Sequence, residues 1–192
     1  PRSTLFPHTT LFRSLSVQVC LSFKSGFARV YPVFQEEGFS YSLIWFGSGE
    51  LGFPDRAVVA FAMGCDAIQI ARESMMAIGC IQAQRCHTGH CPTGVATQSR
   101  WLMSGLDPTH KATRLANYIV TLRKELLQLS HACGQPHPAL ISLNQFDILD
   151  EVFGSRSADE CFDYELGWGL PSAEDSATIR EIMQPQATAA ST

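Results

Sequence analysis

Three of the chain's seven cysteines, Cys80, Cys86 and Cys91, lie within twelve residues, and the last is followed at once by Pro92. An uninterrupted helix from Cys80 to Cys86 would separate the two thiols by about 9 Å along its axis and place them on different faces. The segment 87–89 and Pro92 instead favour a loop, because glycine permits tight turns and proline removes a backbone N–H. A loop would let the three thiols converge.

Three interpretations of this loop remain open from the residues alone. Iron–sulfur proteins gather thiolates in such loops, and a Cys-Pro ending is typical of ferredoxin cluster segments. A Cys₃His zinc site is the second interpretation, with His87 or His90 as the ligand that closes the tetrahedron. The third is a set of buried thiols without a ligand, because free cysteine is among the most buried residue types.

Composition limits the classes of partner. The formal charge is −4, and no run of lysine or arginine occurs, which argues against nucleic acid and anionic membrane surfaces. The longest unbroken apolar run, Ala57–Met63, is far shorter than the ~20 residues that cross a bilayer. An odd number of cysteines without a paired framework favours a reducing compartment, so we expect a cytoplasmic protein.

The stretch from Tyr41 to Ala71 predicts a strand, a loop, a helix and a second strand. The first strand is Tyr41–Phe46, which is apolar and rich in β-forming residues, and the second is Asp66–Ala71. Between them, Pro54 can open a helix that stops at Gly64. Such a βαβ unit implies parallel strands.

Two loops of this unit are candidates for binding a phosphate group. In (β/α)₈ barrels, phosphates commonly bind at the loops after the last two strands, where backbone N–H groups face the anion. Here Gly47-Ser48-Gly49 follows the first strand and Ala71-Arg72 follows the second. Taken alone, a Gly-x-Gly sequence is equally well explained as a plain tight turn.

Three further helices are predicted from caps and apolar periodicity. The predicted helices run from Arg29 to Gly38 with Pro32 in the first turn, from the N-cap Asp107 to Gly134, and from Ser142, with Gln145 as its capping-box partner, to Gly154.

The segment Gly79–Gln98 resembles the cluster segment of the glutamate synthase family, most of all its short FMN-binding members. The resemblance implies that Cys80, Cys86 and Cys91 hold a 3Fe-4S cluster with no fourth protein ligand. It also implies that the FMN phosphate is bound at Gly47, Ser48 and Gly49 and at Ala71 and Arg72, with Arg72 pairing with the phosphate. Two residues depart from the family, which often has a basic residue at the position of Glu50 and a glycine at that of Ala71.

The resemblance implies an α/β fold: the C-terminal fragment of a (β/α)₈ TIM-type barrel, contributing its last two strands, then the cysteine loop and a helical C-terminal extension. Pro1–Ser14 lacks an initiator methionine and resembles a translated sequencing adapter. The expected divisions are an artefact or unassigned segment over 1–28, the barrel end with its iron–sulfur loop over 29–100, the helical extension over 101–175 and a flexible tail over 176–192.

The function that the resemblance implies is glutamate synthesis from 2-oxoglutarate and glutamine or ammonia, by an oxidoreductase acting on CH–NH₂ donors. Electrons would come from ferredoxin or a reductase subunit and pass through the cluster and FMN. The fragment alone is expected to be inactive. The alternative is a non-enzymatic zinc-binding or iron–sulfur interaction module that docks through its helices.

Overall fold

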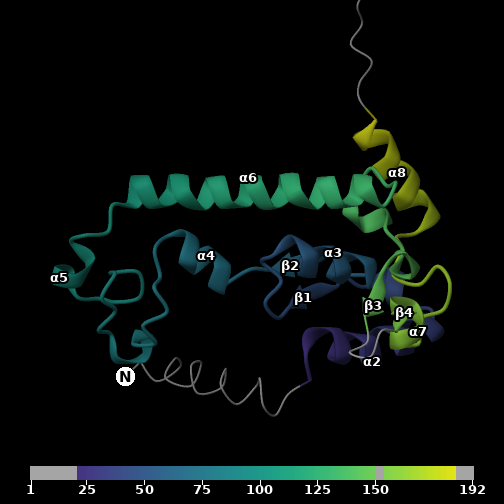
Figure 1. Cartoon of the computed structure of the whole chain (residues 1–192), viewed down its shortest axis with the longest axis horizontal. Coiled ribbons are helices and arrows are strands. Elements are labelled where there is room, and N and C mark those ends of the chain that lie inside the picture. The colour runs from purple at the N-terminus through teal and green to yellow at the C-terminus, as the bar shows by residue number, and fades with distance from the viewer. Residues whose placement is uncertain (1–20, 150–153, 185–192) are drawn as a thin grey trace, which may run out of the picture.

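The structure, a computed structural model, describes residues 21–149 and 154–184. In chain order the elements are α2 (Phe23–Glu36), the 3-10 helix η1 (Ser40–Ser42), β1 (Phe46–Ser48), α3 (Pro54–Ala62), β2 (Ala67–Gln69), α4 (Arg72–Ala77), η2 (Cys86–Thr88), α5 (Arg100–Met103), α6 (Pro108–Ala132), η3 (Pro138–Leu140), η4 (Leu143–Gln145), β3 (Asp147–Leu149), β4 (Ser155–Ser157), α7 (Ala158–Phe162) and α8 (Ala173–Met183). Helix α6 runs along one side of the molecule, with the β1–α3–β2 unit and α4 beside it and α2 on the opposite side (Figure 1).

The predicted parallel βαβ unit is confirmed, and with it the α/β class. Strands β1 and β2 pair in parallel, with Phe46 opposite Ala67 and Ser48 opposite Gln69, and α3 connects them. Pro54 occupies the first turn of α3, where its missing N–H breaks no helical hydrogen bond.

The first strand lies later in the chain than predicted. The predicted strand Tyr41–Phe46 was wrong, because Ser40–Ser42 is a 3-10 helix and β1 begins only at Phe46. The partner strand explains the shift: Asp66 and Ala67 both donate their N–H to the Trp45 carbonyl, and ladder pairing starts one residue later. Gly47 and Ser48 therefore belong to the sheet, and the loop begins at Gly49.

Helix α2 also starts earlier than predicted. It begins at Phe23 rather than Arg29, with Ser22 as N-cap, so Pro32 lies well inside the helix instead of in its first turn. An internal proline removes one hydrogen bond and crowds the preceding turn. Some other interaction must therefore stabilise α2.

Aromatic packing supplies that stabilisation. Phe23, Phe27 and Tyr31 recur every four residues on one face of α2, with neighbouring ring centroids 5.4 and 5.5 Å apart. Phe27 and Tyr31 also meet the Trp45 ring at 5.6 and 5.2 Å. This i, i+4, i+8 spacing of aromatic residues was the sequence signal for the earlier helix start.

The segment after α7, to which the sequence assigns no role, closes the core. The Tyr164 ring stacks on Tyr31 at 5.7 Å, and its hydroxyl donates to the Met63 carbonyl at 3.0 Å. Gly169, at φ +81°, lies so close to the backbone that a Cβ there would be 2.4 Å from the Ala62 oxygen. The core that they complete consists of buried residues from α2, α3, α6, α7 and the turns after α6.

Helix α6 agrees with its prediction at both ends. The Asp107 carboxylate accepts from the N–H groups of Thr109 and His110, and Gly134 follows the helix at φ +73°. Its buried leucines, Leu122 and Leu126, face α3 and the core.

The helix predicted from Ser142 to Gly154 is wrong. Ser142 and Gln145 do form the predicted capping box, but it caps only the single turn η4. The Gln145 amide donates to the Cys133 carbonyl, which ties this turn to the end of α6, and Phe146 is extended. The chain then forms β3, which pairs antiparallel with β4, and residues 150–153 between them lie outside the described part.

The expected divisions of the chain cut two helices. The boundary after residue 28 falls inside α2, and the one after residue 175 falls inside α8, which Ser172 caps and which continues to Met183. Of the expected tail, residues 185–192 lie outside the described part. No helix among the described residues is both long and apolar enough to cross a membrane.

The buried Tyr31 hydroxyl should make the fold sensitive to alkali. Burial raises the pKa of Tyr31 from 10.0 to about 12. Between pH 10 and 12 the unfolded chain loses this proton while the folded chain keeps it, so the free energy of unfolding falls as pH rises, by about 2 kcal/mol in total. Urea titrations across that range should show a shallower decline for Tyr31→Phe than for the wild type. Equal slopes for Tyr31→Phe and the wild type would contradict the assignment.

Candidate functional site

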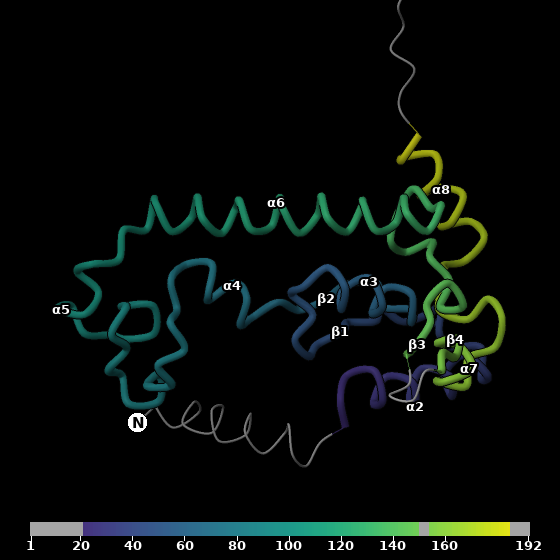
Figure 2. Tube along the Cα trace, in the orientation of Figure 1, coloured from purple at the N-terminus to yellow at the C-terminus, as the bar shows by residue number. Residues whose placement is uncertain are grey.

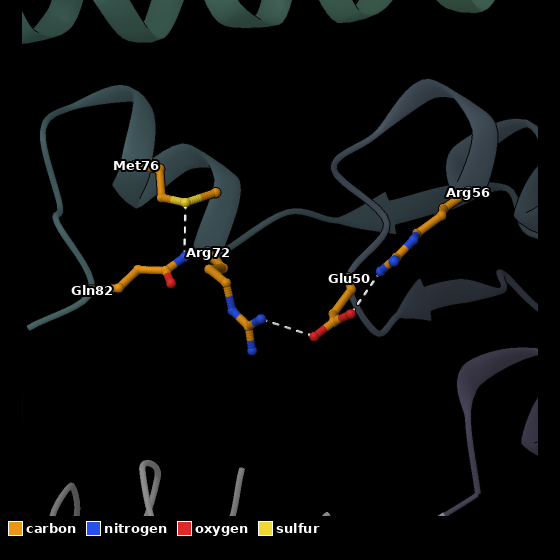
Figure 3. Close-up of polar contacts among 5 residues, drawn as sticks. All are labelled: Glu50, Arg56, Arg72, Met76 and Gln82. Carbon is orange, nitrogen blue, oxygen red and sulfur yellow. Dashed lines mark hydrogen bonds and ion pairs between the residues drawn. The ribbon is translucent and has the colours of Figure 1, made fainter. Parts of the chain in front are cut away.

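The cysteine loop follows α4 directly, and its shape is set by backbone dihedral angles and backbone hydrogen bonds. The chain leaves the helix at Gly79, which has φ +111°, and the Cys80 N–H still donates to Met75. Gln82 and Gln84 both have left-handed backbones, near φ +57° and +55°, which turn the chain sharply before Cys86. The Gln82 side chain donates to the Met76 sulfur at 3.0 Å, so the loop folds back on α4 (Figure 3).

The second half of the loop is also closed by hydrogen bonds. Thr88 donates to the Arg85 carbonyl at 2.8 Å inside the single turn η2, and Thr97 donates to the Gly89 carbonyl across the loop. Gly94, at φ +75°, lies against α5, where a Cβ would be 2.5 Å from the Leu102 oxygen. The loop therefore has a defined shape that depends on Gly94.

All three cysteines line one small pocket in this loop. The lining residues are Cys80, Ile81, Ala83, Gln84, Arg85, Cys86, Cys91, Pro92 and Thr93. Cys91 is buried, Cys80 is half-buried and Cys86 is exposed, and all three are free thiols. Within residues 21–149 and 154–184, no three His, Cys, Asp or Glu side chains are close enough together to hold one metal ion.

Cys91 has the most distinctive environment of the three. Burial raises its pKa, but hydrogen bonds from the Thr93 hydroxyl and from the backbone N–H groups of Ala96, Thr93 and Val95 outweigh that effect and lower the pKa to about 7. Groups that stabilise a thiolate also suit it to a metal, since thiolates are the form that ligates. Thr93 was not predicted as a site residue; the available signal was a hydroxyl two residues after a cysteine.

The two loops predicted to bind phosphate lie at the same edge of the parallel sheet. Ser48 ends β1, Gly49 follows it at φ +144°, and both are exposed. Ala71 is the exposed N-cap of α4, and Arg72 is its first residue. Gly47 differs, because it is buried in β1, where a Cβ would be 2.9 Å from the Cys65 sulfur.

Glu50 joins these two loops. One of its carboxylate oxygens is 2.9 Å from the Arg72 guanidinium, and the other is 2.6 Å from that of Arg56 (Figure 3). Arg56 was not predicted as a site residue; the available signal was a cation in the first turn of the helix that follows the loop. The carboxylate that departs from the family pattern thus contacts both arginines.

Contacts from α6 and α4 hold the loop after β1 in place. The Tyr118 hydroxyl donates to the Gly52 carbonyl at 2.7 Å, and Glu73 of α4 packs so closely that a Cβ on Gly52 would be 2.5 Å from its Cγ. Helix α6 also contacts α3 and α4. In the Cα trace the sheet and α4 lie beside α6, and the cysteine loop follows α4 at the end of the molecule that carries α5 (Figure 2).

Comparisons with known proteins agree on one family. A family model described as the conserved region in glutamate synthase matches residues 14–136. The chain is similar to the glutamate synthase large subunit-like protein YerD of Bacillus subtilis, 38% identical over 66% of this chain and 24% of that protein. It is also similar to the archaeal glutamate synthase [NADPH] of Methanocaldococcus jannaschii, 34% identical over 60% of this chain and 23% of the relative. A ferredoxin-dependent glutamate synthase of Antithamnion sp. is 34% identical over 73% of this chain but only 8% of the relative. The chain thus spans about a quarter or less of the length of these curated relatives.

Replacing Gly94 by alanine should destabilise the cysteine loop. The substitution adds a left-handed non-glycine residue, which costs about 1–2 kcal/mol, and also a contact of 2.5 Å with the Leu102 oxygen. Gly89→Ala is the matched control, because Gly89 has nearly the same φ, +73°, with no atom within 4 Å of the added Cβ. Urea unfolding should show a larger loss for Gly94→Ala than for Gly89→Ala. Equal losses would mean that the contact with α5 does not constrain the loop.

Proposed function

This chain belongs to the glutamate synthase family, and we propose that it carries the end of an FMN-binding barrel together with the iron–sulfur loop of such an enzyme. The observation that supports this most is the path of the chain. Arg72 stands at the edge of the parallel sheet, and α4 leads from it directly into the pocket lined by the three cysteines. One short helix thus connects a candidate phosphate site to a candidate cluster site.

The parallel pair β1 and β2 supports the barrel proposal. Parallel strands are found almost entirely in sheets that are covered on both faces, and two strands alone are a small sheet. Here Phe46, in β1, is 62% exposed, and Ile44 just before it is 74% exposed. Large apolar side chains in that position are expected to pack against further strands, which is the role of the remaining barrel strands in our proposal.

The proposed phosphate site uses residues from both strand ends. Backbone N–H groups at Ser48 and Gly49 and around Ala71 would donate to the phosphate oxygens. Arg72 would add a charge-assisted hydrogen bond through its planar fork of donors. Gly47 has a different role in this scheme: its lack of a side chain lets β1 pack against Cys65 and Leu51.

The residue types of the loop support an iron–sulfur cluster, because thiolates are the usual protein ligands of such clusters. Cys80, Cys86 and Cys91 line one pocket, and the Thr93 hydroxyl and neighbouring N–H groups stabilise a thiolate at Cys91. We therefore propose these three cysteines as the cluster ligands, with a 3Fe-4S cluster as the form that three thiolates suit. When bound, the cluster supplies single electrons and FMN passes electron pairs to a substrate. The residues of this chain would hold both groups in place.

For the whole protein we propose reductive synthesis of glutamate from 2-oxoglutarate. Glutamine or ammonia would supply the nitrogen, and ferredoxin or a reductase subunit would supply the electrons. The names of the relatives, which include NADPH and ferredoxin-dependent enzymes, support an oxidoreductase. Most of the flavin and substrate contacts would be made by segments of the whole protein that correspond to the parts of the relatives not covered by this chain.

Single Cys→Ser substitutions should identify the cluster ligands. After anaerobic reconstitution with iron and sulfide, Cys80→Ser, Cys86→Ser and Cys91→Ser should each lose most bound iron and visible absorbance, because serine is a poor ligand for this centre. Cys133→Ser, which changes a half-buried thiol outside the loop, should keep the wild-type iron content. Full iron content in any of the three loop variants would remove that residue from the ligand set. Stoichiometric zinc in place of iron would overturn the cluster proposal.

Arg72→Ala should weaken binding of FMN but not of riboflavin, which lacks the phosphate. Loss of one charge-assisted contact of about 1.5 kcal/mol corresponds to roughly a tenfold loss of affinity. The affinities for FMN and for riboflavin can both be measured from the quenching of flavin fluorescence when the full 192-residue chain is added. If Arg72→Ala lowers the affinities for FMN and riboflavin equally, the phosphate does not bind at this residue.

A further inference from the structure

Glu50 places one carboxylate between two guanidinium groups from different helices. Arg56 belongs to the first turn of α3, Arg72 opens α4, and the loop after β1 carries Glu50 to both. Figure 3 shows the carboxylate pointing into the space between them, with one oxygen toward each arginine. We call Arg56 and Arg72 the arginine pair.

The charges of Arg56, Arg72 and Glu50 favour an anion with more negative charge than one carboxylate. Glu50 carries one negative charge against two positive charges, so the three side chains together remain cationic. A phosphate monoester carries nearly two negative charges at neutral pH and three acceptor oxygens. It can therefore match both guanidinium groups more fully than one carboxylate can.

The group is also accessible to an anion from solution. The side chains of Arg56, Glu50 and Arg72 are 46%, 39% and 31% exposed. Ion pairs between such exposed groups contribute little to stability, because water and salt screen them. A dissolved phosphate can therefore replace the carboxylate without exposing a buried charge.

The backbone holds Glu50 in this position. Glu50 has φ +60°, in the left-handed region that residues with a Cβ rarely adopt. On one side it follows Gly49, whose close approach to Phe23 leaves no room for a Cβ, and on the other it precedes the buried Leu51. The loop thus presents Glu50 to the arginine pair in a conformation that its own sequence does not favour.

We propose that Arg56 and Arg72 bind the phosphate together, and that Glu50 is an internal anion that occupies the arginine pair until a phosphate displaces it. This inference rests on the proposed phosphate site and adds a second binding residue and a built-in competitor to it. Until a phosphate binds, Glu50 keeps the two guanidinium groups close together. It also weakens phosphate binding, because the phosphate must displace it and remain beside its charge.

The test is a titration of the full 192-residue chain with inorganic phosphate, followed by ³¹P NMR line broadening at constant ionic strength. Chloride replaces phosphate in the reference, so that general salt screening is subtracted. Glu50→Gln should bind phosphate about tenfold more tightly than the wild type, and Arg56→Ala should bind it about tenfold more weakly. Glu50→Gly removes the same charge and fits the left-handed backbone, so it tests the competitor even if Glu50→Gln folds poorly.

Two exposed residues provide charge-matched controls. Glu174→Gln on α8 and Arg114→Ala on α6 change the net charge by the same amounts as Glu50→Gln and Arg56→Ala, and both should keep wild-type phosphate affinity. If the controls shift as far as the site variants, the effect is one of net charge and the proposal is wrong.

The variants separate this inference from the proposed function. If Arg72→Ala weakens phosphate binding but both Glu50 variants bind as the wild type does, the phosphate site stands and the internal competitor is refuted. If Arg56→Ala is the only one of these variants that binds phosphate as the wild type does, Arg56 is not a second phosphate-binding residue. If Arg72→Ala has no effect, or no protein binds phosphate, the phosphate site itself is refuted.

Discussion

The packing of α6 against α3 and α4 is the contact on which the rest of the structure depends. The two strands of the parallel sheet are three residues each, and a sheet of that size has little stability of its own. Leu122 and Leu126 of α6 are buried against the core, and each buried leucine contributes about 1.5–3 kcal/mol. The Tyr118 hydroxyl adds a hydrogen bond to the loop after β1. One helix thus stabilises both the sheet edge and the start of the cysteine loop.

The two candidate sites differ in how their geometry is held. The cysteine loop is shaped by backbone conformation, with positive φ angles at Gly79, Gln82 and Gln84 and short hydrogen-bonded turns between them. The sheet edge is instead organised by charge, through the contacts of Glu50 with Arg56 and Arg72. Exposed ion pairs exchange partners readily, so the sheet edge would suit a ligand that comes and goes, whereas the closed backbone of the cysteine loop would suit the resident metal centre that we propose.

Local signals predicted most of the regular structure near the sites. Asp107 with Pro108, Pro54 at the start of α3, and the Ser142–Gln145 capping box were all identified from sequence, because each satisfies backbone groups within a few residues of itself. The prediction failed where a distant partner decides the conformation. The Ser142 helix stops after one turn, since Gln145 bonds to Cys133 and the next residues pair with β4.

The sequence by itself determined the order of the βαβ unit, the long helix and the family-specific spacing of Cys80, Cys86 and Cys91. The resemblance to the family also identified Glu50 as a departure from it, but did not indicate what Glu50 contacts. Tertiary structure decided that Glu50 lies between two arginines, because Arg56 and Arg72 are brought together by the parallel pairing of two strands, in which Phe46 lies opposite Ala67. It decided the start of α2 in the same way, since Phe23 and Phe27 stabilise a helix only when Trp45 and the core are there to receive them. Contacts between residues far apart in sequence depend on the folded arrangement, and no local pattern encodes them.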